Sequence, residues 1–231
     1  SGAALLVDYV LTIAVSIAAA GDALFSFLPL SWLPLKTWVE IVLIAGLTAI
    51  NLRGVKESVL TLLPIFVVFL VTHALLIFGG VLFQIGEVGE RAVAIHQDYR
   101  SGLSSLGVGG MLLLFLHAYS LGGGTYTGIE AVSNGVPIMR EPKVETAKRA
   151  MLLMAASLAL TASGLTACYL LWDLSPTPGK TLNAVLFEHV AERLSLGNWF
   201  VIVTLVAEGA LLVAAAQAGF LDGPRVLANM A

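Results

Sequence analysis

A single carboxylate stands inside a long apolar stretch of this sequence. Glu130 is the only acidic residue between Asp98 and Glu141, and it follows three consecutive glycines at 122–124. An ionisable group inside a membrane span is by default a hypothesis for a functional site. Residues 127–130 (Thr-Gly-Ile-Glu) also fit the capping box that begins a helix. The two roles are compatible, because a capped helix start is itself a place for polar ligands.

The glycine triplet Gly122, Gly123 and Gly124 predicts a break in the helix that would otherwise run through it. Each glycine costs roughly 1 kcal/mol against alanine in a helix interior. The alternative role is close helix packing, but GxxxG-type packing needs glycines four positions apart. Lipid cannot hydrogen-bond a freed backbone, so an unwound segment has to face protein or a water-filled cavity. We therefore expect carbonyls of this segment, with Thr125 and Tyr126 beside it, to line a site for a cation or an ammonium group.

Other polar side chains lie inside apolar runs. Thr12 and Ser16 are four residues apart, which puts both hydroxyls on one face of a helix. They could bind a ligand, or bond back to their own helix as Ser and Thr often do. Asp22 is either a proton-coupling group or a solvated group at the outer interface. His73 and His117 can titrate near physiological pH, although each can equally be a packed, hydrogen-bonded histidine.

The composition is that of an integral membrane protein. The chain of 231 residues is 58% hydrophobic and 12% charged, about half the charged fraction of a soluble domain. Its mean hydropathy is +0.92. A net charge of −3 does not suggest nucleic acid as a partner. Cys168 is the single cysteine, which excludes an internal disulfide. No nucleophile-elbow, zinc-protease or phosphate-loop motif is present, so we expect no enzyme activity, no cofactor and no metal beyond a cation at the site.

Six apolar runs are long enough to cross a bilayer about 30 Å thick at about 1.5 Å per residue. We expect membrane helices over residues 4–28, 36–52, 57–84, 106–138, 144–172 and 197–221, the fourth broken at the glycines. Residues 180–195 are predicted to form an amphipathic helix on the extracellular or periplasmic membrane surface. Lys and Arg are denser in the loops after the second and fourth helices, which we therefore assign to the cytoplasm. We expect one transmembrane domain over residues 1–231, as a fragment of a longer protein that opens with Ser rather than Met.

Three stretches resemble the amino acid–polyamine–organocation (APC) superfamily of permeases. Residues 8–21 resemble its third transmembrane helix, residues 125–137 its broken sixth helix, and residues 220–225 the end of its eighth. One departure is Gly223, where the family usually has Phe. The resemblance implies an all-α polytopic fold with two inverted five-helix repeats, of leucine-transporter type, of which this chain holds the third to eighth helices. The family's first helix, which supplies half of the substrate site, would then lie outside this chain.

Within the superfamily the chain is most similar to the branch of Kup- and Kim-like potassium importers. In that branch potassium is held by hydroxyls of the third helix and by a Thr and a Glu three residues apart in the sixth. The resemblance therefore implies a potassium site at Thr12, Ser16, Thr127 and Glu130. In some amino acid permeases a lysine of the fifth helix takes the place of a sodium ion, but the predicted helix 57–84 has no lysine inside its span.

The leading hypothesis is a proton-coupled secondary transporter of potassium in the bacterial cytoplasmic (inner) membrane. Glu130, Asp22 and His73 are the candidate proton-coupling groups. The first alternative is a proton-coupled amino acid permease, in which the substrate carboxylate meets the start of the second half-helix and the ammonium meets the free carbonyls. The second is a permease-like membrane sensor or subunit that does not transport. The partners are the small cation or amino acid, the proton and the lipid bilayer, with a homodimer among the alternatives for assembly.

Overall fold

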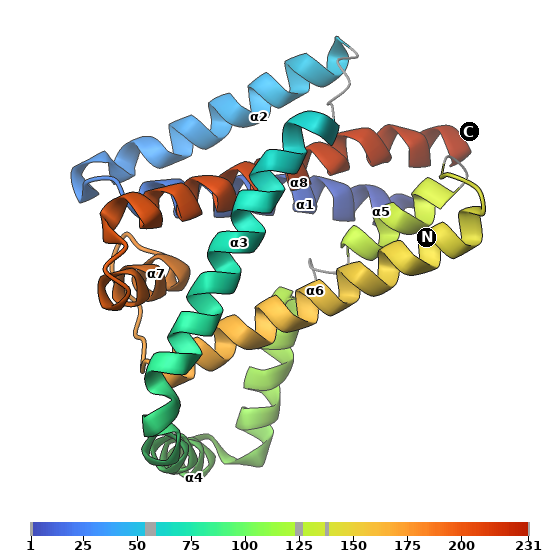
Figure 1. The fold of residues 1–231 in the computed structure, drawn as a ribbon. Helices are drawn as coiled ribbons and strands as arrows, with labels where there is room; N and C mark the ends of the chain where they lie inside the picture. Colours follow the sequence, from blue (N-terminus) through green and yellow to red (C-terminus); the bar gives the residue numbers. More distant parts are fainter. Residues whose placement is uncertain (1, 54–58, 123–126, 137–138, 231) are drawn as a thin grey trace. The chain divides into compact units, whose positions relative to one another are not determined.

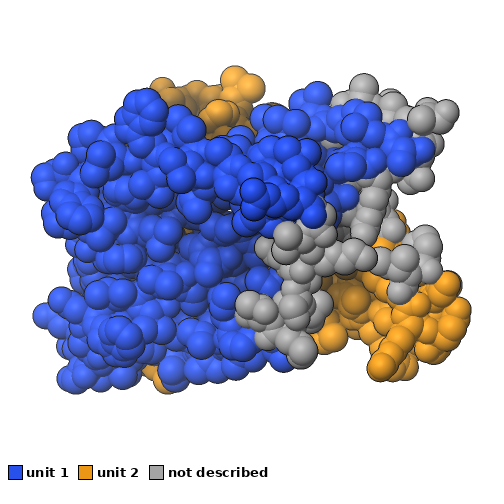
Figure 2. All heavy atoms as spheres, turned by 90° about the horizontal axis from the view of Figure 1, so that it is seen from above, with its two compact units in different colours: residues 1–79, 174–231 blue, residues 80–173 orange. Residues whose placement is uncertain are grey.

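The computed structural model describes residues 2–53, 59–122, 127–136 and 139–230 (Figure 1). Every element among them is helical. The chain forms two compact units (Figure 2), one of residues 1–79 and 174–231 and one of residues 80–173. Each unit is described by itself.

The first unit is built on α1 (Gly2–Phe25) and α8 (Gly197–Met230), which pack along most of their length. A 3-10 turn, η1 (Leu30–Leu35), leads into α2 (Lys36–Leu52), and α2 packs on both long helices. The core here is formed by Ile17, Leu47 and Ala216. The unit also contains most of α3 (Val59–Gln84) and the short α7 (Leu182–Arg193), which packs on α8.

Glycines of α8 allow it to approach α1 closely. A Cβ at Gly219 would lie 2.8 Å from Ile13 Cγ1 and 3.1 Å from the backbone oxygen of Tyr9. A Cβ at Gly209 would lie 3.1 Å from the side chain of Leu24. Small residues are the usual means of close helix contact in membranes, where lipid removes the hydrophobic drive between helices.

The second unit holds the broken helix. It contains η2 (Ile85–Glu87), α4 (Val88–Leu121), α5 (Thr127–Gly135) and α6 (Lys143–Leu171). α4 consists of two helical pieces (Figure 1). They are joined at Gly107, whose φ of 67° is a left-handed value open to glycine. α5 packs against α6 so closely that a Cβ at Gly128 would lie 2.9 Å from Met154 Sδ.

The sequence prediction of an all-α polytopic membrane protein is confirmed. Among the described residues, five stretches are long and apolar enough to cross a membrane: Leu6–Phe25, Leu30–Leu52, Leu62–Leu121, Lys143–Leu171 and Gly197–Leu221. The third of these has 60 residues and merges the third and fourth helices expected from the sequence. The fourth predicted helix, 106–138, corresponds to the second piece of α4, which ends at Leu121, and to α5, which begins at Thr127. Gly123 and Gly124 of the predicted break lie outside the described residues.

Two segments extend further than the sequence suggested. Residues 88–105 fall between the helices predicted over 57–84 and 106–138, yet they form the first piece of α4, from which Gly107 then turns the chain. The last membrane helix was expected to end before Pro224, yet α8 continues to Met230. Proline is tolerated within membrane helices because neighbouring groups satisfy the backbone that it frees.

A reciprocal amide pair joins α2 to α8 inside the first unit. Asn51 Nδ2 donates to Gln217 Oε1 over 2.8 Å, and Gln217 Nε2 donates to Asn51 Oδ1 over 3.0 Å. Gln217 is only 1% exposed. Each amide therefore satisfies the other in a place that water does not reach.

Replacing one member of this pair should cost more stability than replacing both. Gln217→Leu leaves the Asn51 amide without its partner, so we expect a loss of about 1–3 kcal/mol, whereas removing both partners can be nearly neutral. Thermal unfolding of the full-length protein in detergent would measure Asn51→Leu, Gln217→Leu and the double variant. A double variant whose loss in the free energy of unfolding equals the sum of the two single losses would contradict a role for the pair.

Candidate functional site

The first half of the predicted site is a face of α1. Thr12 and Ser16 lie one helical turn apart and are both half-buried. Ile13 and Ile17, between and beside them, pack into the core against α2 and α8. The two hydroxyls therefore flank the packed face of α1, and that packing fixes the position of the backbone that carries them.

The second half lies at the interruption between α4 and α5. Gly122 caps the end of α4, and its N–H donates to carbonyls of the preceding turn. The predicted site residues Gly123, Gly124, Thr125 and Tyr126 lie outside the described residues. Thr127 is the first residue of α5 and Glu130 lies one turn further on, so both belong to the start of a helix, as the capping-box pattern predicted.

The two halves belong to different units. Thr12 and Ser16 are in the first unit, and Gly122, Thr127 and Glu130 are in the second. The structure brings Thr12 and Ser16 together on one helix, and Thr127 and Glu130 together on another. A site that combines the two halves remains a prediction from the sequence.

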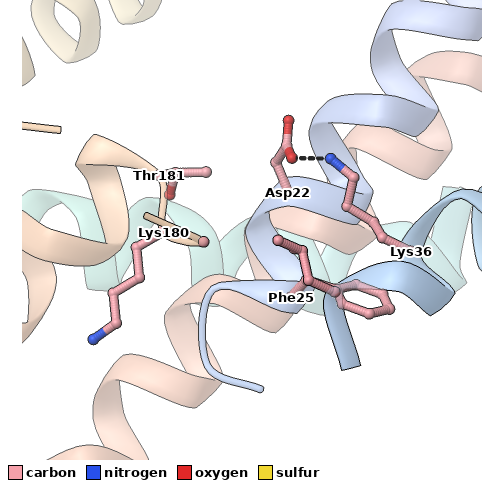
Figure 3. A pocket seen from close by; sticks show the side chains of 7 residues that line it. Asp22, Phe25, Lys36, Lys180 and Thr181 are labelled. Atoms are coloured by element: carbon pink, nitrogen blue, oxygen red, sulfur yellow. Dashed lines mark hydrogen bonds and ion pairs between the residues drawn. The ribbon is translucent and has the colours of Figure 1, made fainter. Parts of the chain in front are cut away.

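Asp22 forms an ion pair near the C-terminal end of α1. Its carboxylate pairs with the ammonium of Lys36 (Figure 3). Lys36 Nζ also lies 3.7 Å from Glu40 Oε1. Asp22 is 51% exposed, whereas Glu40 is only 15% exposed. One ammonium group thus serves two carboxylates. The role of Asp22 in proton coupling stays a prediction, and the structure adds the lysine that any such role has to displace.

A cavity of about 390 Å³ opens beside this ion pair within the first unit (Figure 3). Its lining combines the end of α1, one residue each of η1 and α2, and the residues before α7: Asp22, Phe25, Leu33, Lys36, Gly179, Lys180 and Thr181. Lys180 is itself paired with Glu188, at 2.6 Å. Since carboxylates occupy both lysines, the cavity offers no unpaired cation to an anionic ligand. The contact between Lys36 and Glu40 could have been predicted from their spacing of four residues, which is a known ion-pair signal.

His73 is packed between aromatic rings. It is 3% exposed, and its Nδ1–H donates to the carbonyl of Phe69 over 3.0 Å. Its ring centroid lies 3.9 Å from that of Phe69 and 5.2 Å from that of Phe187, which comes from α7. His117, in contrast, lies on an exposed part of α4. For His73 the contacts are those of a hydrogen-bonded packing residue.

A half-buried carboxyl group in α8 is paired with α7. Glu208 Oε1 accepts a hydrogen bond of 2.6 Å from Asn183 Nδ2. The other oxygen, Oε2, is buried and has no hydrogen-bond partner among the described residues. The pairing joins residues 25 positions apart, so no local sequence pattern could have revealed it. No group of three or more potential metal-ligating side chains is found in the described part of the chain.

Comparison with known proteins gives two matches. The family described as "Amino acid permease" matches residues 1–231. The chain is also similar to the potassium transporter KimA of Bacillus subtilis (strain 168), with 32% identity over 233 residues. That match covers 100% of this chain and 36% of KimA. The chain thus spans little more than a third of the length of the curated relative it matches.

Proposed function

The chain belongs to the amino acid permease family, and from this premise we propose that it forms part of a proton-coupled secondary transporter of potassium. The observation that carries the proposal is a pattern of oxygen-bearing residues on two helices. Thr12 and Ser16 share one turn of α1, and Thr127 and Glu130 share the first turn of α5. The relative that is 32% identical is itself named a potassium transporter, which supports the same cargo here.

The chemistry of these groups suits a desolvated alkali cation. Hydroxyl, carbonyl and carboxylate oxygens can replace the water shell of an ion that crosses a membrane. Broken helices supply unwound carbonyls for this purpose in transporters. In the proposal Thr12, Ser16 and Thr127 contribute hydroxyls, the segment 122–126 contributes carbonyls, and Glu130 contributes the negative charge.

Proton coupling follows from the carboxylate in one of two ways. If Glu130 binds either a proton or potassium, the two ions compete for it and cross in opposite directions. If both ions cross together, the proton has to occupy another group while Glu130 neutralises the potassium. In the second case Asp22 would have to exchange its ion pair with Lys36 for a proton, and His73 would have to use the ring nitrogen that does not bond to Phe69.

An amino acid is the second candidate cargo, because the family itself is described as amino acid permeases. The start of α5 would receive the substrate carboxylate, since helix N-termini favour anions. Carbonyls of the 122–126 segment would receive its ammonium group. The described residues of α3, Val59–Gln84, include no lysine that could replace a sodium ion.

Rubidium uptake decides between the two cargoes. We would reconstitute the full-length protein in liposomes, impose a pH gradient and follow labelled rubidium with unlabelled potassium or an amino acid mixture as competitor. Uptake that only potassium blocks supports the proposal. Accumulation of an amino acid by a protein that takes up no rubidium would assign it to the amino acid permeases.

The two hydroxyls of α1 should set the affinity for rubidium. Thr12→Val and Ser16→Ala each remove one oxygen. We expect each to raise the rubidium concentration that gives half-maximal uptake by about tenfold, which corresponds to about 1.4 kcal/mol of binding free energy. Thr48→Val is the matched control, because the Thr48 hydroxyl donates to the Ile44 carbonyl of its own helix. An unchanged half-saturation in both α1 variants would remove these hydroxyls from the site.

A further inference from the structure

We propose that Glu208 is a proton-binding carboxyl group of this protein, and that it takes up its proton when α7 docks on α8. The proposal rests on the proposed function in one respect. A transporter that moves a proton and potassium together needs a proton site apart from the carboxylate that neutralises the potassium. Binding of a proton at Glu208 can nevertheless be measured without any transport.

The geometry around Glu208 satisfies only half of the carboxyl group. Oε1 accepts from Asn183 Nδ2 at 2.6 Å, while Oε2 is buried with no hydrogen-bond partner in the described ranges. Thr204, one turn earlier in α8, is fully buried, and its hydroxyl donates to the Phe200 carbonyl. Gly209, the next residue, lies against Leu24 of α1. Glu208 is therefore half-buried with a single donor, and its Oε2 is closed to water.

No described basic group compensates the charge of Glu208. Glu188 of α7 pairs with Lys180, and Lys36 of α2 with Asp22 of α1. His189 of α7 bonds through Nδ1 to the Val185 carbonyl. The remaining titratable residues on α1, α2 and α7, the elements packed against α8, are Asp8, Tyr9, Glu40, Glu192 and Arg193. In the part of the chain that the structure describes, none of these groups forms an ion pair with Glu208.

A proton explains this junction better than a metal cation does. A buried carboxylate with one donor and no cation beside it carries a large desolvation penalty, which a proton on Oε2 removes. An alkali ion would need space and several further oxygens. Two cavities of the first unit, one beside the Asp22–Lys36 ion pair and one between α7 and the start of α8, are lined by other residues and do not include Glu208. The bond to Asn183 survives protonation, because Oε1 then accepts as the carbonyl oxygen.

Docking of α7 is what closes the junction. The helix is anchored at its start, where the Thr181 N–H donates to Ser26 Oγ over 3.0 Å. Its apolar face is buried, with Phe187 against His73 and Val190 beside Gly79. The outer face of α7 is charged, with Glu192 and Arg193 exposed on it, so that side of the helix faces water. If α7 leaves, Asn183 leaves with it and Glu208 opens to this water, which solvates the carboxylate form well. The docked form thus binds the proton more tightly than the undocked form.

The sign of the pH effect follows from this difference. Whichever form binds the proton more tightly is favoured as the proton concentration rises, so α7 should dock more firmly at acid pH and loosen as the pH rises. Linkage to one proton allows the docking constant to change by at most about tenfold per pH unit. Glutamine at position 208 keeps an oxygen for Asn183 and cannot ionise, so it should hold α7 docked at every pH.

Hydrogen exchange of the full-length protein in lipid nanodiscs tests the proposal. We would measure protection factors of α7 peptides from pH 5 to pH 8 in potassium-free buffer, expressed against the intrinsic exchange rate at each pH. We expect protection in the native protein to fall as the pH rises, and Glu208→Gln to stay at the high value throughout. Glu188→Gln is the matched control, because it removes a half-exposed carboxylate from α7 itself, and it should follow the native curve.

Three results would overturn the proposal: a native curve without pH dependence, a Glu208→Gln curve that follows the native one, or a Glu188→Gln curve as flat as expected for Glu208→Gln. Should Glu208→Gln yield no folded protein, Asn183→Asp replaces it. A second carboxylate beside Glu208 should lower the protection factors of α7 peptides at least tenfold at pH 8 and leave those at pH 5 nearly unchanged. Native protection factors in this variant at pH 8 would overturn the proposal. Rubidium uptake is measured separately, so a failed potassium function and a failed proton site give different results.

Discussion

Replacing Glu130 by glutamine will abolish potassium-competed rubidium uptake by the full-length protein. Glutamine keeps the size and one oxygen of the side chain but removes the negative charge. Removing one partner of a buried ion pair costs about 3 kcal/mol or more, which corresponds to a loss of about 100-fold or more in cation affinity. Uptake from liposomes at several external pH values would measure the loss and the coupling together.

Glu145→Gln is the matched control for this variant. Glu145 lies in the first turn of α6, is 58% exposed and pairs with Arg149 at 3.2 Å. Loss of that carboxylate should leave uptake and its pH dependence unchanged. Native pH-dependent flux in Glu130→Gln would show that the cargo charge is neutralised elsewhere and would withdraw Glu130 from the proposed site.

Local sequence signals predicted the elements that carry the candidate site. The glycine triplet begins directly after Leu121, the last residue of α4. A helix end there is expected, because three glycines in succession are poor helix formers wherever they lie. Spacing by four residues placed Thr12 and Ser16 on one face of α1, because helix periodicity needs no tertiary information. Apolar runs do not predict a helix over residues 88–105, since a polar segment can also be helical and the turn at Gly107 is not visible from composition.

Contacts between distant residues were beyond the sequence. The ion pair of Asp22 joins two helices, and the pairing of Glu208 with Asn183 depends on how α7 docks. The contact of Gly223 is also between distant residues. The ring of Tyr9 lies 4.0 Å from where a Cβ of residue 223 would stand, which is ordinary van der Waals contact.

Close packing of α1 on α8 leads to the last prediction, which concerns Gly219. Gly219→Val places a branched side chain where even a Cβ would lie 2.8 Å from Ile13 Cγ1 and 3.1 Å from the Tyr9 carbonyl oxygen. The side chain of Ile13 can rotate, but the Tyr9 oxygen is backbone and moves only with the helix. We expect a loss of about 1–3 kcal/mol in the free energy of unfolding, measured by thermal unfolding in detergent, and a loss of rubidium uptake.

Gly46→Val separates this clash from the effect of a branched residue on a helix. Gly46 lies inside α2 and no atom lies within 4 Å of a Cβ built there. This variant should unfold close to the native temperature and keep native uptake. Equal destabilisation of both variants would attribute the loss to helix propensity instead of packing. A destabilised Gly219→Val that retained native rubidium affinity would mean that the α1 face with Thr12 and Ser16 tolerates displacement, which an ion site built from short hydroxyls should not allow.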